Sequence, residues 1–158
     1  MTVLLLAGLL AACRQAPPPA APPPPPPAPS STQNGYGATE RAFVELAIAT
    51  DEQALRLLGP TGRAELRENR NTELTALRKL LDAPYVNHHA GHDMPGMPTD
   101  AEIRLASTDP DAREQFVRAH LTESLEVIRS ARQAITHPPT AEVVALMERH
   151  RTAELAAG

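Results

Sequence analysis

The densest set of candidate metal ligands lies in the middle of the chain. Residues 88–97 read HHAGHDMPGM and hold three of the six histidines and two of the four methionines. Imidazole binds zinc, nickel and copper, whereas a thioether is a soft donor that favours monovalent copper. Glycine and proline interrupt regular structure here, so the segment predicts either a flexible metal-binding arm or a polar linker with little packing. The candidate ligands are His88, His89, His92, Met94 and Met97.

A second set of candidate ligands lies on expected helices. His120 and Glu123 are three residues apart and His150 and Glu154 are four apart, so each pair shares one side of its helix. Met147 lies on the same stripe as His150, where core packing is the more frequent role of methionine. These residues predict either hydrogen-bonded His–carboxylate pairs or a site for a divalent metal. A di-iron oxidase site is not expected, because its paired Glu-x-x-His motifs are missing.

The first 38 residues have the pattern of export and attachment signals. An apolar run from position 3 to 12 is too short to span a bilayer but suits the core of a signal peptide. It leads into Leu-Ala-Ala-Cys, which resembles the bacterial lipobox. We therefore expect a signal peptide over 1–12 and lipidation of Cys13; the alternative is a free thiol beside an ordinary cleavage site. Because Cys13 is the sole cysteine, its lipidation would leave no thiol for disulfides, thiolate metal sites or nucleophilic catalysis.

The segment 13–38 is expected to be a tether. Ten of the thirteen residues from Pro17 to Pro29 are proline, which favours extended polyproline geometry. At about 3.1 Å per residue this stretch would hold a domain roughly 40 Å from its anchor. A ligand for SH3-type domains is the alternative role.

The remaining residues, 39–157, are expected to form one all-α domain. Apolar residues recur at helical spacing, and the breaks carry Gly or Pro. The connections are short except in the middle, which predicts an antiparallel four-helix bundle of two helical hairpins joined by the His/Met-rich linker. Thr99 and Glu102 form a capping box for a short extra helix. The expected helices are 39–58, 62–81, 99–106, 109–135 and 140–156.

The two halves of this domain resemble each other weakly. Phe43-Val44 opens the first long helix as Phe116-Val117 opens the third. Near the end of each half the sequence reads RNTEL over 70–74 and RTAEL over 151–155. A duplicated helical hairpin is the simplest explanation.

With these features the chain resembles the exported bacterial family called domain of unknown function three hundred and five, which includes CopM-like copper-binding proteins. The most specific match is GHDMPGM at 91–97, followed by DAEI at 100–103. The resemblance implies a ferritin-like four-helix bundle and copper as the bound ion. The family typically carries a His-His pair in each long helix, whereas this chain reads Thr50-Asp51 and Glu123-Ser124 there. The resemblance therefore implies the fold, but not a metal site inside the bundle.

The expected function is copper capture or tolerance by a lipoprotein of the cell envelope, anchored in a membrane by lipid and binding the metal ion through the linker. A second copy of the chain or an envelope protein is a further candidate partner. The alternative is a degenerate bundle acting as an interaction or scaffold module.

Two other classes of function are not expected. With a net charge of -4, scattered arginines and only four aromatic side chains, the composition argues against nucleic acid. Without a nucleophile elbow or a glycine-rich phosphate loop, the sequence predicts no enzyme.

Overall fold

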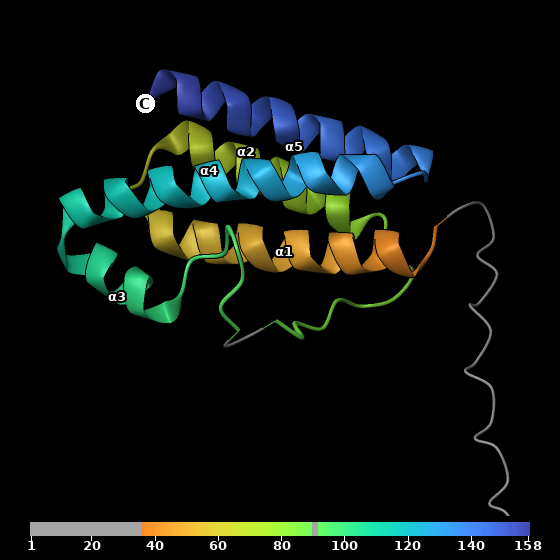
Figure 1. Cartoon of the computed structure of the whole chain (residues 1–158). Helices are drawn as coiled ribbons and strands as arrows, with labels where there is room; N and C mark the ends of the chain where they lie inside the picture. The colour runs from red at the N-terminus through yellow and green to blue at the C-terminus, as the bar shows by residue number, and fades with distance from the viewer. Residues whose placement is uncertain (1–35, 90–91) are drawn as a thin grey trace, which may run out of the picture.

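All the regular structure in the described part of the chain is helical. The computed structural model describes residues 36–89 and 92–158 (Figure 1). The regular elements among these residues are all helices, which confirms the all-α prediction for this part of the chain. Within it, no helix is long and apolar enough to cross a bilayer. The expected signal peptide, Cys13 and the proline segment lie outside the described residues. The helices are α1 (Ala38–Leu58), α2 (Ala64–Arg78), α3 (Asp100–Thr108), α4 (Pro110–Ala134) and α5 (Pro138–Ala157).

Local capping chemistry sets the boundaries of α3 and α4. Thr99 and Glu102 form the expected capping box, in which the Glu102 carboxylate accepts the Thr99 backbone N–H at 2.8 Å. Asp109 caps α4, because its side chain accepts two backbone N–H donors at 3.0 Å, and Pro110 occupies the first helical position. These signals lie within a few residues of each helix start, so they are readable in the sequence.

The start of α1 differs from the expected N-cap at position 39. Gly37 is the N-cap, because the Glu40 carboxylate reaches back and accepts its backbone N–H at 2.9 Å. The second helix is shorter than the expected 62–81, since a turn follows Arg78. Boundary shifts of this size leave the faces of the helices unchanged.

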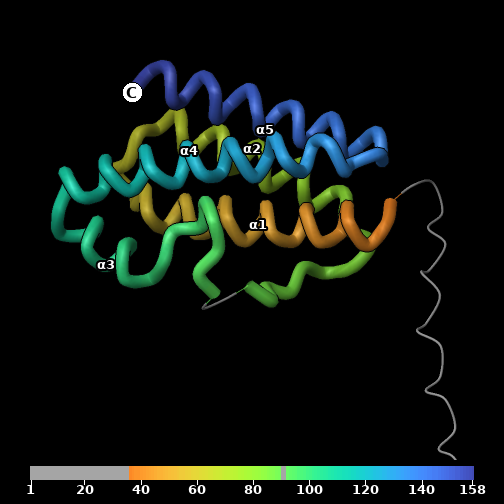
Figure 2. Tube along the Cα trace, viewed as in Figure 1, coloured from red at the N-terminus to blue at the C-terminus, as the bar shows by residue number. Residues whose placement is uncertain are grey.

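Each of the four longer helices packs mainly against two of the others. Helix α1 packs on α2 and α4, and α5 packs on the same two helices, so the contacts close into a ring (Figures 1 and 2). Helix α3 lies against α1 and α4. We call α1 and α2 the first helix pair, and α4 and α5 the second helix pair.

Both hydrophobic clusters of the core contain residues from both helix pairs. In the larger cluster, the first pair contributes Phe43, Val44, Ala47, Ile48, Leu74 and Leu77, and the second pair and its connection contribute Ile128, Ile135, Val143, Val144 and Met147. In the smaller cluster, the first pair contributes Leu57, Leu58 and Leu66, which meet Ala106, Val117 and Leu121. Neither helix pair therefore has a complete core of its own.

The linker between the helix pairs, residues 79–99, is docked at its end. Met97 is 3% exposed and Pro98 is fully buried. The Met97 backbone N–H donates to the Met94 carbonyl at 3.0 Å, and the Gly96 N–H donates to the Glu123 carboxylate at 3.0 Å. The expectation that segment 88–97 adds little to packing is therefore wrong for its last residues.

Gly96 allows this turn to approach α4. Its φ is 78°, and a Cβ added there would lie 2.8 Å from the backbone N and Cα of Ser124. The left-handed conformation costs other residues about 1–2 kcal/mol, and the overlap adds to this cost. We expect Gly96→Ala to lower the free energy of unfolding by about 2–3 kcal/mol in denaturant titrations.

Gly59→Ala is the matched control for this change. Gly59 also has a positive φ, 63°, but an added Cβ would meet no atom within 4 Å. We expect this variant to lose only the conformational part, about 1–3 kcal/mol, because its φ of 63° and ψ of -174° are rarely adopted by residues other than glycine. A loss of no more than about 1 kcal/mol in Gly96→Ala would contradict the importance of its contact with Ser124.

Candidate functional site

The three linker histidines lie at the surface. His88 and His92 are exposed and His89 is half-buried. In the described part of the chain their rings take part in no hydrogen bond or ion pair, and the contacts of His89 and His92 run through the backbone. Among residues 36–89 and 92–158, no group therefore competes with a ligand for these ring nitrogens. The half-buried Met94 lies close by, whereas Met97 can coordinate a metal only if the turn leaves the helices.

An open groove of about 440 Å³ joins the linker to α3 and α4. Asp93 and Met94 line it from the linker side, and His120 lines it from α4. The His120 Nε2 atom lies 3.1 Å from a Glu102 oxygen, and its Nδ1 atom lies 3.7 Å from a Glu123 oxygen. The groove thus brings the predicted His120–Glu123 pair next to one linker ligand.

The rest of the second candidate set lies elsewhere. Met147 is 2% exposed in the larger hydrophobic cluster, while His150 and Glu154 contact a buried arginine network. The five side chains therefore lie in three environments. Among residues 36–89 and 92–158, no group of three His, Cys, Asp or Glu side chains is arranged to hold a metal.

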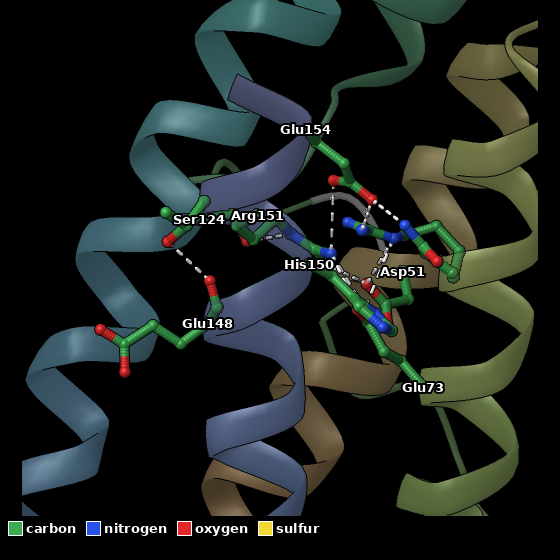
Figure 3. A network of polar contacts seen from close by, with 10 residues as sticks. Asp51, Glu73, Ser124, Glu148, His150, Arg151 and Glu154 are labelled. Carbon is green, nitrogen blue, oxygen red and sulfur yellow. Dashed lines mark hydrogen bonds and ion pairs between the residues drawn. The ribbon is translucent and has the colours of Figure 1, made fainter. Parts of the chain in front are cut away.

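A buried network of charged side chains joins three helices (Figure 3). Its carboxyl and guanidinium groups are at most 3% exposed, and the imidazole at its rim is 21% exposed. Buried ions need partners, because removing each from water costs several kcal/mol. The members are Asp51 of α1, Arg70 and Glu73 of α2, and His150, Arg151 and Glu154 of α5.

Arg151 is the centre of this network. Its Nη2 atom donates to Asp51 Oδ1 at 2.7 Å, and its Nη1 atom donates to the two Glu73 oxygens at 3.0 and 3.2 Å. Its Nε atom donates to the Ser124 hydroxyl at 3.2 Å. One guanidinium thus links α5 to α1, α2 and α4, which the planar fork of arginine allows.

The arginine–glutamate bonds are reciprocal between the helix pairs. Arg151 of the second pair binds Glu73 of the first pair, and Arg70 of the first pair binds Glu154 of the second pair at 2.5 Å. Each partner lies at the same place in the Arg-x-x-Glu sequence of its own half. Each bond therefore joins the first residue of one of the two similar segments, 70–74 and 151–155, to the fourth residue of the other.

The neighbours of these two glutamates are reciprocal as well. His150 Nδ1 lies 2.6 Å from Glu73 Oε1, and the Asn69 amide donates to Glu154 Oε1 at 2.8 Å. Asn69 and His150 each precede the arginine of their half. The two halves differ in the type of this residue, because the first half has an asparagine and the second half has a histidine, whose imidazole can bind a proton.

Burial changes the proton affinity of the network. It raises the pKa of Glu73 to about 10, and the charge of Asp51 adds to this rise. Burial also raises the pKa of Asp51 to about 7, although the charge of Arg70 opposes the rise. Burial and Arg70 lower the pKa of His150. Just above pH 7, Glu73 therefore keeps its proton, and the network carries less negative charge than its three carboxyl groups could supply.

Sequence reasoning singled out three of the six members of this network, with Asp51 noted at a His-His position of the family, and missed the other three. It named His150 and Glu154 as candidate ligands, but gave no role to Arg70, Glu73 or Arg151. The available signal was the repeated Arg-x-x-Glu spacing, which indicated duplication without indicating that both arginines are buried.

No protein-family model, curated protein or solved structure matches this chain. Functional assignment therefore depends on the chemistry of its own residues. Two features are relevant: the surface imidazoles of the linker, and the buried network in which His150, Arg151 and Glu154 of α5 each contact a charged group of another helix.

Proposed function

We propose that this chain is a copper-binding lipoprotein of the bacterial cell envelope, with a role in copper capture or tolerance. The observation that carries the proposal is a difference in contacts between the linker histidines and the helix histidines. The linker imidazoles are open to solvent, whereas His120 and His150 each contact a glutamate. Imidazoles suit divalent copper, and the nearby Met94 thioether suits monovalent copper. Lipidation of Cys13 would anchor the domain, with the proline segment as spacer.

The proposal includes the fold and the family. The four longer helices form an antiparallel, ferritin-like bundle, and the chain is a divergent member of domain of unknown function family three hundred and five. The ring of helix contacts and the central linker support this assignment. At the positions of the family's His-His pairs, Asp51 and Ser124 both bind Arg151. We therefore assign copper to the linker rather than to the bundle interior.

Copper titration of the full chain tests this assignment. We expect the combined variant His88→Ala, His89→Ala, His92→Ala and Met94→Ala to lose at least roughly tenfold in affinity for both oxidation states, or more than about 1.4 kcal/mol. Helicity should be unchanged, because these side chains are exposed or half-buried. Parent and variant both carry Cys13→Ala, so that the thiol cannot compete for copper.

The matched control replaces the helix imidazoles, as His120→Gln and His150→Gln. It should lose stability and keep its copper affinity. If the linker variant binds copper as tightly as the parent while the control does not, the helices hold the metal. If neither variant changes binding, the alternative holds: a bundle acting as an interaction or scaffold module. The replacement of both His-His pairs by partners of Arg151 favours that second function.

A further inference from the structure

The interface between the helix pairs is complementary to itself. Arg70 reaches from the first pair to Glu154, and Arg151 reaches from the second pair to Glu73. Two equivalent bonds thus cross one interface in opposite directions. Two-fold homodimers show this pattern, in which residue i of one copy contacts residue j of the other and the reverse.

Neither helix pair can bury its apolar face alone. Ile48 and Leu77 of the first pair and Val144 of the second pair are fully buried in a cluster that both pairs build. Two helices of this length rarely make a stable core without a partner. A helix pair that separates from its own chain must therefore pack on another one.

The linker determines which copy supplies that partner. Residues 79–95, which precede the docked end of the linker, would span roughly 20–25 Å if they behaved as a flexible chain, which offers the second helix pair at an effective concentration in the order of millimolar. A second chain competes once its own local concentration approaches this value. The local concentration of chains rises when many copies are anchored to one surface.

We propose that two copies of this chain exchange helix pairs. The first pair of each copy then packs on the second pair of the other, and the Arg70–Glu154 and Arg151–Glu73 bonds join different chains. The contacts within each half of the dimer are those of the single chain, and only the path of the linker changes. The proposal does not depend on copper binding, so either can fail without the other.

Charge reversal tests the exchange. The first variant carries Asp51→Asn, Arg70→Glu and Glu73→Arg, because Asp51 also binds Arg151, and the second carries Arg151→Glu and Glu154→Arg. Within a single chain, either variant places like charges across the interface. When the two variants exchange helix pairs, opposite charges face each other again at both interfaces. One interface then has the natural arginines and glutamates, and the other has both Arg–Glu bonds with their charges reversed.

The full chains are unfolded and refolded separately or as an equal mixture, with reductant present so that Cys13 cannot crosslink. Each variant alone should refold with reduced helicity and a lower melting temperature. The mixture should give a heterodimer of twice the chain mass, with helicity and melting temperature close to those of the natural chain.

Two differently tagged natural chains provide a second measurement that needs no buried substitution. They are refolded together at about 1 mM, where the second chain matches the effective concentration of the linker, and then diluted. Mixed dimers in either experiment support the exchange. Their absence from both overturns it. Equal dimer formation by chains mixed after folding would also overturn it, because such dimers join folded surfaces.

Discussion

Replacing Arg151 with methionine is expected to lower the free energy of unfolding at pH 7 by about 3–5 kcal/mol, the range for removing one partner of a buried ion pair. The guanidinium is 1% exposed and holds Asp51, Glu73 and Ser124 at once. Methionine fills most of the aliphatic volume, so the loss comes mainly from the hydrogen bonds that Asp51, Glu73 and Ser124 lose together. Denaturant unfolding at pH 7 measures it.

Two comparisons identify the cause of this loss. Arg132→Met removes an ion pair with Glu148 whose arginine is 65% exposed, and should change stability by less than about 1 kcal/mol. Adding Asp51→Asn to Arg151→Met should cost less than the two single changes together, because both changes break the same bond between Asp51 and Arg151. Strictly additive losses would contradict the pairing of Asp51 with Arg151.

The helices were predictable because their signals are local. The capping box at Thr99 and Glu102 and the Asp109-Pro110 start act within one turn, and apolar periodicity needs only a few turns. The end of the linker was not predictable in this way. Gly96 and Pro98 correctly indicated irregular backbone, but an irregular segment can still be buried, and periodicity does not report how a loop packs.

The buried network depends on contacts that no short stretch of sequence contains. Asp51 and Arg151 are 100 positions apart, and Arg70 and Glu154 are 84 apart. Arginine and glutamate at helical spacing are usually on solvated faces, so their residue types predict exposure rather than burial. Only the repetition of Arg-x-x-Glu in both halves distinguished these residues, and its meaning required knowledge of which helices face each other.

Raising the pH from 7 to 10 is expected to destabilise the protein. Burial raises the pKa of Glu73 from its usual 4.5 to about 10, so the folded chain holds one proton more than the unfolded chain across this window. The free energy of unfolding then falls as the pH rises, by at most about 1.4 kcal/mol per pH unit and about 4 kcal/mol in total. The raised pKa of Asp51, about 7, contributes mainly below this window and only a small part between pH 7 and 8. The groups that face Glu73 are Asp51 from α1, Arg70 from α2, and His150, Arg151 and Glu154 from α5.

The lowered pKa of His150 acts in the opposite direction, but below its usual 6.5, where the unfolded chain binds the extra proton. From pH 8 to 9 the slope therefore belongs mainly to Glu73, because the raised pKa values of Tyr36 and Tyr85 act only as the pH nears the usual tyrosine value of 10. Glu73→Gln keeps the size of a carboxyl that is already neutral at pH 7, so this variant should match the parent near pH 7 and exceed its stability at pH 10. Glu154→Gln, at the corresponding position of the second helix pair, should keep the slope of the parent. A parent whose stability stays constant or rises from pH 7 to 10 would mean that Glu73 is ionised inside the network, with His150 or the arginines balancing its charge instead of a retained proton.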